Sequence, residues 1–316
     1  MKIVVLDRAS IGSDTPLDAL YTLGDVDVYE SSNNSEVIER AKNADVIILN
    51  KIKITREIIS SSKSLKLICI FATGYDNIDI AAAREHGVAV CNVPGYSTDS
   101  VALFTVATAL SLCAKLTEYA DYVRNGEYTA SGIPNKLTPV YHEVKGKTWG
   151  IVGYGNIGKA VAKVAEALGA RVIACKRIPT DEVECVDIDT LCRESDIISL
   201  HCPLDDATRY IINVERISLM KPSVILINEA RGAITDELAV ANAIENGKIA
   251  AFGCDVYSAE PFDAAHPFYR IKERKNVILT PHAAWGSFES RKRCIEIIAN
   301  NIASFNRREM LNRVDN

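Results

Sequence analysis

Short runs of apolar residues alternate with polar segments along most of this chain. A run of about four to eight apolar residues between turn residues is typical of a strand buried on both faces, as in a parallel sheet. Five such runs occur in the first part of the chain and six in the second. They are Lys2–Leu6, Val26–Tyr29, Asp45–Leu49, Lys66–Phe71, Val88–Cys91, Thr148–Val152, Arg171–Cys175, Asp196–Leu200, Ser223–Ile227, Ala250–Cys254 and Val277–Leu279. Strands separated by helical segments predict an α/β architecture, and the six later strands suffice for a complete doubly wound domain.

Helical segments of different character link and follow these strands. The segment from Thr98 to about Tyr119 is predicted to be one long helix whose apolar residues run nearly all round it, which indicates deep burial. The stretch from Arg124 to Lys147 contains glycines and prolines but little periodicity, so we interpret it as an arm, a lid or an oligomer contact. A last helix, from Ser287 to about Arg307, follows the final strand, and we expect it to return to the first group of strands.

The length of the chain divides these elements between two domains. At 316 residues the chain is too long for one ordinary core and suits two α/β domains. We expect one domain to comprise residues 1–98 and 287–316, with a second domain, residues 99–286, inserted in it.

The amino-acid composition indicates which kinds of ligand the protein is expected to bind. The net charge is −5, from 36 basic and 41 acidic residues, so no basic field favours nucleic acid or an anionic membrane, and a small soluble substrate is expected. Nine cysteines are scattered without a CxxC pair, which predicts buried free thiols in a reducing compartment and no metal site. The first residues are typical of a strand rather than a signal segment, and no apolar run approaches the length of a membrane span. We therefore expect a cytoplasmic protein.

A glycine-rich motif opens the second group of strands. It follows an apolar strand, begins a predicted helix and is completed by a second strand, and it consists of Gly153, Tyr154, Gly155, Asn156, Ile157 and Gly158. The glycines suit a tight turn, the approach of a pyrophosphate to the backbone, and close contact of helix and strand, while the helix N-terminus offers N–H groups to phosphates. This complete βαβ unit favours a dinucleotide site over a purely structural glycine turn.

The end of the second strand departs from the usual dinucleotide pattern. An acidic residue about 20 positions past the motif normally holds the ribose hydroxyls, but here the strand ends in Lys176 and Arg177. Two cations attract a 2′-phosphate, which predicts a preference for NADP, with NAD as the other cofactor considered. A solvated basic turn, or a ribose contact from Asp181 or Glu182, are the alternatives.

Polar residues follow four neighbouring strands of the second group. They are His201-Cys202-Pro203, Arg231-Gly232, Asp255 with Glu260-Pro261, and Pro281-His282. Ligands bind at the carboxyl ends of the strands in an open α/β sheet, so Arg231, Glu260 and His282 are expected to converge there. A cation, a carboxylate and a histidine are the groups that hydride transfer to a 2-keto acid requires.

These residues belong to a larger set of motifs that extends over nearly the whole chain. The set comprises Ala72–Asp76, Asn92–Tyr96, Gly153–Gly158, His201–Pro203, Ala230–Gly232, Glu260–Pro261 and Thr280–His282. Through these motifs the chain resembles the D-isomer-specific 2-hydroxyacid dehydrogenases. The run Thr98–Ala102 and Trp285 are most similar to the glycerate dehydrogenase and hydroxypyruvate reductase branch of that family.

The resemblance implies a fold and an activity. The fold is a Rossmann doubly wound parallel sheet inserted in a smaller, flavodoxin-like α/β substrate domain. The activity is NAD(P)-dependent reduction of a small 2-keto acid, such as hydroxypyruvate or glyoxylate, to the D-2-hydroxyacid. His282, paired with Glu260, is implied to donate and accept the proton, while Arg231 binds the substrate carboxylate and polarises the carbonyl. A neighbouring carboxylate favours the imidazolium form, which suits protonation of a ketone oxygen near neutral pH.

The resemblance also implies residues that bind the substrate and the cofactor. The backbone of Thr73, Gly74 and Tyr75 is expected to meet the substrate carboxylate from the other domain, so that domain closure completes the site, and Trp285 is expected to line the pocket. Beyond the glycine motif, the expected cofactor contacts are Lys176, Arg177, His201, Cys202, Pro203, Glu229, Ala230 and Asp255.

Simpler interpretations of single residues stand beside these. His201 competes with His282 for the proton role, and Arg231 is alternatively a structural partner of Glu229 or Asp236. Trp285 is alternatively an ordinary core residue. Glu229 stands where the family more often has a small or neutral residue, so its charge either weakens binding of an anionic substrate or faces solvent.

Two other functional classes are compatible with the fold. One is a dinucleotide-sensing, corepressor-like binding protein, and the other is a formate- or phosphonate-type dehydrogenase. The complete set of Arg231, Glu260 and His282 favours the hydroxyacid dehydrogenase over both. We also predict a homodimer, built on the long helix and the segment after it.

Overall fold

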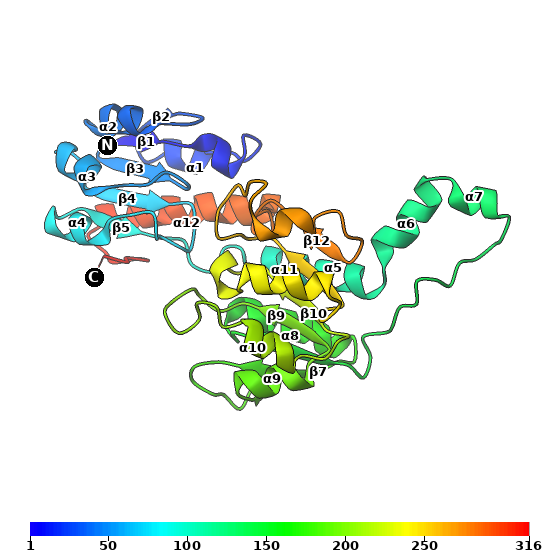
Figure 1. Ribbon diagram of the computed structural model, residues 1–316. Helices are drawn as coiled ribbons and strands as arrows, with labels where there is room; N and C mark the ends of the chain where they lie inside the picture. Colours follow the sequence, from blue (N-terminus) through cyan, green and yellow to red (C-terminus); the bar gives the residue numbers. More distant parts are fainter. Residues whose placement is uncertain (316) are drawn as a thin grey trace. The chain divides into compact units, whose positions relative to one another are not determined.

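The computed structural model describes residues 1–315 and divides into two compact units (Figure 1). The first unit is Met1–Ser97 with Trp285–Asn316, of which Asn316 lies outside the described residues, and the second is Thr98–Ala284. The first division therefore follows residue 97 where the sequence predicted 98, and the second follows residue 284 where it predicted 286.

The first unit is built on a parallel sheet of five strands in the order β2-β1-β3-β4-β5. The strands are β1 (Lys2–Val5), β2 (Asp25–Val28), β3 (Val46–Leu49), β4 (Leu67–Ile70) and β5 (Ala89–Cys91). Side chains of α1 (Asp18–Tyr21) and α12 (Phe288–Asn306) pack on one face. Those of α2 (Asn34–Ala41), α3 (Arg56–Ser61) and α4 (Ile80–Glu85) pack on the other. This is the flavodoxin-like strand order, and the last helix belongs to this unit as predicted.

The second unit is built on a parallel sheet of seven strands in the order β12-β11-β10-β9-β6-β7-β8. The strands are β6 (Thr148–Val152), β7 (Arg171–Cys175), β8 (Glu184–Cys185), β9 (Ile197–Leu200), β10 (Ile225–Asn228), β11 (Ala251–Cys254) and β12 (Val277–Leu279). Side chains of α5 (Thr98–Cys113) and α8 (Asn156–Ala167) pack on one face. Those of α9 (Ile188–Glu194), α10 (Val214–Leu219) and α11 (Glu237–Glu245) pack on the other. The doubly wound fold is confirmed, with β8 as one strand more than the sequence predicted.

The strands form the core because both faces of each sheet are covered. In β3, β4, β9 and β11 every residue is buried, as the continuous apolar runs predicted. The strands are parallel, so their carboxyl ends lie along one edge of each sheet. The loops at that edge of the second unit carry the polar residues identified above. They include the short 3₁₀ helices Gly232–Ile234 and Pro267–Arg270.

The long helix predicted from Thr98 to Tyr119 is two helices. The first, α5, ends at Cys113, and α6 (Leu116–Arg124) begins after Lys115, whose φ of +56° lies in the left-handed region. The two helices are bent by 66° relative to each other. Apolar residues stand on both sides of the break, Leu112 and Cys113 before it and Leu116 after it, so the apolar pattern did not indicate it.

The segment after α5 forms an arm, which was one of the three interpretations of residues 124–147 and which also includes α6. Figure 1 shows α6, α7 (Glu127–Ser131) and the extended chain after them reaching away from the sheet of the second unit. Large apolar side chains on this arm are exposed, among them Leu116, Val123, Ile133, Leu137, Val140 and Tyr141. Within residues 1–315, no single helix is long and apolar enough to cross a membrane, and α5 with α6 meets that test only as a bent pair.

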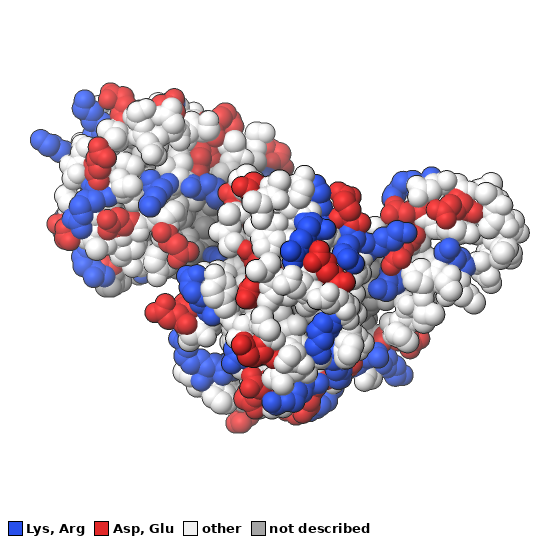
Figure 2. Space-filling view, viewed as in Figure 1, with Lys and Arg blue, Asp and Glu red and all other residues white. Residues whose placement is uncertain are grey.

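Charged side chains of both signs are interspersed on the face shown in Figure 2, as the near balance of 36 basic and 41 acidic residues predicts. The nine cysteines are all free, and six of them are buried in the cores: Cys69, Cys91, Cys192, Cys202, Cys254 and Cys294. Cys113, Cys175 and Cys185 are half-buried, so the prediction of buried thiols holds for six of the nine.

Candidate active site

The glycine-rich loop connects β6 to α8, as predicted. Gly153 has a φ of +96°, and a Cβ on it would lie 2.5 Å from the backbone nitrogen of Cys202. A Cβ on Gly158 would lie 2.3 Å from the carbonyl oxygen of Gly153. Gly155, the N-cap of α8, differs, because no atom of the described chain lies within 4 Å of its Cβ position. The first-turn N–H groups of α8 therefore stay open to a ligand such as a pyrophosphate.

The other three residues of the motif have different surroundings. Tyr154 is buried in the core beneath α5 and α8. Asn156 and Ile157 are the first two residues of α8, and the Asn156 side chain is exposed. These positions at the N-terminus of α8 are compatible with the predicted pyrophosphate site.

Lys176 and Arg177 directly follow β7, where the sequence placed them. Arg177 is exposed and pairs with Asp205, with Nη2 2.5 Å from Oδ2. Glu182, the alternative ribose ligand, pairs instead with Lys159 of α8 at 2.5 Å. Lys176 forms no ion pair with any residue from 1 to 315, so its ammonium group is available to a ligand.

His201 follows β9 and lies against the glycine loop through its backbone. Its N–H donates to the carbonyl of Val152, and its carbonyl carbon would be 2.6 Å from a Cβ on Gly153. The ring is different: Nε2 contacts Ser199 Oγ at 3.0 Å, and Nδ1 is buried without a hydrogen-bond partner in the described chain. Burial lowers the pKa of His201 to about 3. A ring that stays neutral near pH 7 does not suit a proton donor, so the competing assignment of His201 is disfavoured.

A short turn after β10 presents Arg231. Asn228 is completely buried and holds this turn, because its amide oxygen accepts from the N–H of Ala230 at 3.2 Å and its amide nitrogen donates to the carbonyl of Arg231 at 2.9 Å. The Arg231 guanidinium donates to the carbonyl of Ala230 and forms no ion pair within residues 1–315. Asp236 instead caps α11 by accepting from Ala239 N. The alternative of a structural salt bridge to Glu229 or Asp236 is therefore not borne out.

Glu229 lies in the same turn but its side chain is buried, so the alternative in which it faces solvent is excluded. Only 7% of the residue is exposed, and Oε2 lies 2.9 Å from Thr105 Oγ1 of α5. Burial raises the pKa of Glu229 to about 8, with a further contribution from the neighbouring Asp255 carboxylate. The carboxyl group is thus largely neutral at pH 7, so it does not add the negative charge that the sequence suggested. Its predicted contact with the cofactor stays a prediction.

Asp255 follows β11 and organises the turn that carries the second histidine. Its Oδ1 accepts from Thr280 Oγ1 at 2.6 Å and from Ala283 N at 2.8 Å, and Oδ2 accepts from Ala284 N at 2.9 Å. Only 1% of Asp255 is exposed. These contacts hold the chain on both sides of His282, and they are a role that the sequence did not reveal. The predicted contact of Asp255 with the cofactor stays a prediction.

His282 and Glu260 are paired, as the sequence predicted. Nδ1 of His282 lies 2.6 Å from Oε2 of Glu260, and the two side chains are 26% and 30% exposed. The carboxylate fixes the proton on Nδ1, which leaves Nε2 to exchange a proton with a ligand. His282 has a φ of +54°, a conformation that costs a non-glycine residue about 1–3 kcal/mol and recurs at functional sites. Arg231, Glu260 and His282 follow three adjacent strands, β10, β11 and β12.

The predicted substrate loop lies in the first unit, after β4. Thr73 Oγ1 donates to the carbonyl of Val93 at 2.8 Å, which anchors the loop. Among residues 1–315 the N–H groups of Gly74 and Tyr75 have no acceptor. Such open amides are suited to a carboxylate. Trp285, also in the first unit, is partly buried and packs edge-on against Tyr96, with ring centroids 6.2 Å apart. This contact is compatible with either interpretation of Trp285.

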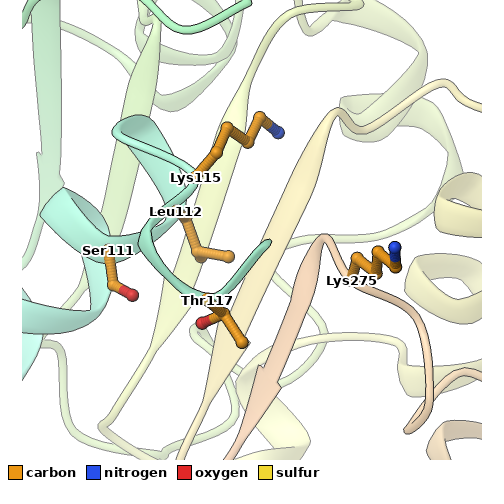
Figure 3. Close-up of a pocket in the computed structure, with 5 residues that line it drawn as sticks. All are labelled: Ser111, Leu112, Lys115, Thr117 and Lys275. Carbon is orange, nitrogen blue, oxygen red and sulfur yellow. The ribbon is translucent and has the colours of Figure 1, made fainter. Parts of the chain in front are cut away.

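Two hollows in the second unit lie away from this site. A shallow depression is lined by Ser111, Leu112, Lys115, Thr117 and Lys275 (Figure 3). A cavity of about 240 Å³ is lined by the end of α5, the end of the arm and the amino ends of several strands. Val144, Ile197 and Ala251 are among its lining residues. The strands are parallel, so their amino ends lie at the edge opposite the Glu260–His282 pair. Neither hollow belongs to the site described above.

Comparison with known proteins agrees with this geometry. Residues 106–284 match the model of the D-isomer specific 2-hydroxyacid dehydrogenase, NAD binding domain. The chain belongs to the D-isomer-specific 2-hydroxyacid dehydrogenase family. Members of this family act on the CH–OH group of 2-hydroxyacids with a nicotinamide cofactor, so the expected enzyme class is confirmed, as is the binding of NAD(P).

Individual known proteins match most of the chain. A hydroxypyruvate reductase from Blautia hydrogenotrophica is 37% identical over 96% of this chain and 97% of its own. A glyoxylate reductase from Thermococcus litoralis is 37% identical over 87% of this chain and 84% of its own. The crystal structure of the TT0316 protein from Thermus thermophilus covers 99% of this chain and 100% of its own, with a TM-score of 0.90 and 32% identity.

Proposed function

We propose that this dehydrogenase reduces a short 2-keto acid, hydroxypyruvate or glyoxylate first, to the corresponding 2-hydroxyacid, the D isomer where a stereocentre forms. The observation that carries the proposal is the Glu260–His282 pair at 2.6 Å, formed by the loops after β11 and β12. These two strands come next after β10, which presents Arg231, in the order of the sheet. The relatives named for hydroxypyruvate and glyoxylate support the choice of substrate.

The glycine loop fits a nicotinamide dinucleotide. The space over Gly155 is open, and Gly153 and Gly158 occupy positions where a Cβ would collide with backbone. The N-terminus of α8 would hold the pyrophosphate, while the backbone at His201 and Cys202 lies beside the loop. When bound, the dinucleotide supplies the hydride equivalent that reduction of a keto acid requires.

The residues of the chain supply the proton and the charge. We assign to His282 the transfer of a proton from Nε2 to the carbonyl oxygen, with Glu260 stabilising the resulting charge through Nδ1. We assign to Arg231 the binding of the substrate carboxylate and the stabilisation of negative charge on the carbonyl oxygen. The open amides of Gly74 and Tyr75 are proposed as further donors to a carboxylate.

The test is an assay of keto-acid reduction with matched histidine variants. Hydroxypyruvate, glyoxylate and pyruvate are supplied with NADPH or NADH, and formate is supplied with the oxidised cofactors. We expect turnover with hydroxypyruvate or glyoxylate and none with formate. His282→Ala should lower kcat by roughly 10²–10⁴-fold with little change in cofactor affinity, because general acid catalysis is lost while the cofactor contacts remain.

Two controls separate the proposed roles. His142→Ala removes an exposed histidine of the arm and should leave kcat unchanged. His201→Ala should harm kcat much less than His282→Ala, and equal losses would reverse the assignment. Absence of turnover across the keto acids with either cofactor would contradict the proposed substrate class.

We also propose that NADPH is preferred to NADH. Lys176, at the end of β7 and without an ion pair within residues 1–315, is placed to attract a 2′-phosphate, and Arg177 with its partner Asp205 lies beside it. A charge-assisted contact contributes about 1.5–3 kcal/mol, which corresponds to roughly a tenfold to hundredfold preference. The measurement is the ratio of kcat/KM for the two cofactors. Lys176→Asp should reverse the ratio, whereas Lys163→Asp, on α8, should not.

We further propose that the enzyme is a homodimer joined through the arm. Leu137 is 77% exposed and Val140 is 66% exposed, and together with the other apolar side chains of the arm they form a large uncovered apolar surface. A second copy of the chain would cover such a surface with the same residues, as two-fold symmetry requires.

A further inference from the structure

A buried carboxylate behind the Glu260 loop has no part in the mechanism proposed above. Glu237 is the first residue of α11 and is 8% exposed. Its Oε1 accepts from the N–H of Ser258 at 2.8 Å, and its Oε2 accepts from the hydroxyl of Ser258 and from Nε2 of His266 at 2.9 Å. Buried carboxylates cost several kcal/mol unless donors surround them, so this group is held by specific contacts.

The contacts of His266 define the charge of this cluster. The N–H of Phe268 donates to Nδ1 of His266 at 3.1 Å, so Nδ1 carries no proton. Nε2 therefore carries the proton and donates it to Glu237. A neutral imidazole and three donors leave Glu237 as an anion, and its position at the N-terminus of α11 further stabilises the negative charge.

The donors come from both sides of Glu260 along the chain. Ser258 precedes Glu260 by two residues and His266 follows it by six, so one carboxylate ties both ends of the loop. Between the two ties, Phe262 stacks on His266 with ring centroids 4.9 Å apart. The loop that carries Glu260 is therefore held at both ends by the buried Glu237 carboxylate and not by apolar packing alone. We call Glu237 and His266 the anchor of this loop.

Tyr257 connects this anchored loop to the other catalytic segments. Its backbone N–H donates to Oε1 of Glu260 at 3.0 Å, and its hydroxyl donates to the carbonyl of Thr280 at 2.8 Å, two residues before His282. A Cβ on Gly232, next to Arg231, would lie 2.1 Å from the carbonyl carbon of Tyr257. The segments that carry the arginine, the carboxylate and the histidine therefore all touch one residue that the Glu237 cluster fixes.

We propose that Glu237 and His266 are positioning residues for the Glu260–His282 pair. They act through Ser258 and Tyr257, and they hold the Glu260 carboxylate at hydrogen-bond distance from Nδ1 of His282. The inference rests on the proposed function for its catalytic meaning, but the geometry it describes is measurable without turnover.

The decisive experiment records the Nδ1 proton of His282 by ¹H–¹⁵N NMR of the full-length protein labelled at histidine. A proton held between Nδ1 and a carboxylate resonates far downfield and exchanges slowly with water. The signal is assigned by its loss in His282→Gln. We expect Glu237→Gln and His266→Ala to make its exchange at least about tenfold faster, because the loop opens more readily without its anchor.

The matched control is Asp196→Asn. Asp196 is also a part-buried carboxylate of the second unit, with one backbone donor, Thr148 N, and one side-chain donor, Lys221 Nζ, but it lies at the amino edge of the sheet. It should lower thermal stability without changing the exchange of the His282 proton. An unchanged signal in both anchor variants, or an equal change in the control, would overturn the proposal.

Kinetics give a second, separable measurement. If keto-acid reduction is found, Glu237→Gln should lower kcat about tenfold with less than a twofold change in the KM for the cofactor. If no keto acid is reduced, the proposed function fails while the NMR result still decides whether the anchor holds the pair. Should Glu237→Gln not fold, Ser258→Ala removes only one hydroxyl. It should still accelerate the exchange about threefold, and a rate equal to wild type would count against the anchor.

Discussion

The hydrogen bonds of Thr105 depend on whether the neighbouring Glu229 carboxyl carries a proton. The hydroxyl of Thr105 lies 2.9 Å from Oε2 of Glu229 and 2.9 Å from the carbonyl of Val101, but it has one proton to donate. If Glu229 is protonated, it donates to Thr105 and Thr105 donates to Val101, so every group is satisfied. An ionised Glu229 would compete with Val101 for the same proton. Burial is the main cause of the raised pKa of Glu229, and the hydroxyls of Thr105 and Thr108 offset only part of it.

This neutral carboxyl predicts a pH dependence of stability. The pKa of Glu229 is about 8 in the folded chain and close to the usual glutamate value when unfolded. The folded state therefore binds the proton more tightly, and its contribution is complete below the unfolded pKa and lost as pH rises to about 8. Glu229→Gln should be no more stable than wild type at pH 5 but should gain relative to it between pH 5 and pH 8, by up to about 1.4 kcal/mol per pH unit.

Thermal unfolding measured across that range checks the prediction. Glu182→Gln is the control, since Glu182 is exposed and its pKa is lowered by Lys159 rather than raised. Parallel stability curves for wild type and Glu229→Gln from pH 5 to pH 8 would mean that Glu229 is ionised in the folded chain.

The residues that the sequence revealed differ in kind from those it concealed. Arg231, Glu260 and His282 were predictable because each lies in the loop that follows a strand, and the carboxyl ends of parallel strands meet at one edge. Asn228 and Asp255 hold the turns between these residues through backbone contacts, which leave no pattern in the sequence. Glu237 and His266 are 29 residues apart, so their pairing depends on how α11 lies against the loop after β11.

Among the elements, most strands were predicted, but the short edge strand β8 and the break between α5 and α6 were not. Eleven strands follow from apolar runs, but β8 has two residues, Glu184 and Cys185, with no apolar run to indicate it. The boundary between α5 and α6 was missed for the opposite reason. Lys115 adopts a left-handed conformation that glycine usually adopts, while apolar residues continue on both sides of it.

The first turn of α8 offers a test with two nearly identical substitutions. Gly158→Ala places a Cβ 2.3 Å from the carbonyl oxygen of Gly153, so it should push α8 from β6 and lower the melting temperature by several degrees. Gly155→Ala meets no described atom within 4 Å and has an ordinary φ of −93°, so stability should be nearly unchanged. It should nevertheless weaken cofactor binding, because the methyl group occupies the space over the helix N-terminus.

Melting curves and titration of intrinsic fluorescence with NADPH separate the two effects. The expected pattern is loss of stability in one variant and loss of affinity alone in the other. Unchanged NADPH affinity in Gly155→Ala would show that the pyrophosphate does not lie against this glycine.

At the scale of the whole molecule, the exposed apolar arm predicts that two copies of the chain form a dimer. Exposed apolar side chains recur along it, and the exposed Leu103 of α5 adds to the uncovered surface of the same unit. We expect light scattering at micromolar concentration to give a mass near twice 34.5 kDa. The double variant Leu137→Asp with Val140→Asp should be monomeric, whereas Ile178→Asp, which changes an exposed apolar residue outside the arm, should leave the mass unchanged. A monomeric wild type would refute the arm as a dimer contact.

The path of the chain through its two units has a practical consequence. The second unit begins at Thr98 and ends at Ala284, and the hydroxyl of Ser100 donates to the carbonyl of Ala284 at 2.6 Å, so its two ends are tied together. A segment whose ends meet is a self-contained cassette that tolerates excision or grafting into another host loop. Residues 98–284 expressed alone should fold and report dinucleotide binding through the fluorescence of Trp149, which lies in that unit. Because the two ends of this unit are close together, a single insertion into a surface loop would add the whole unit to an unrelated protein.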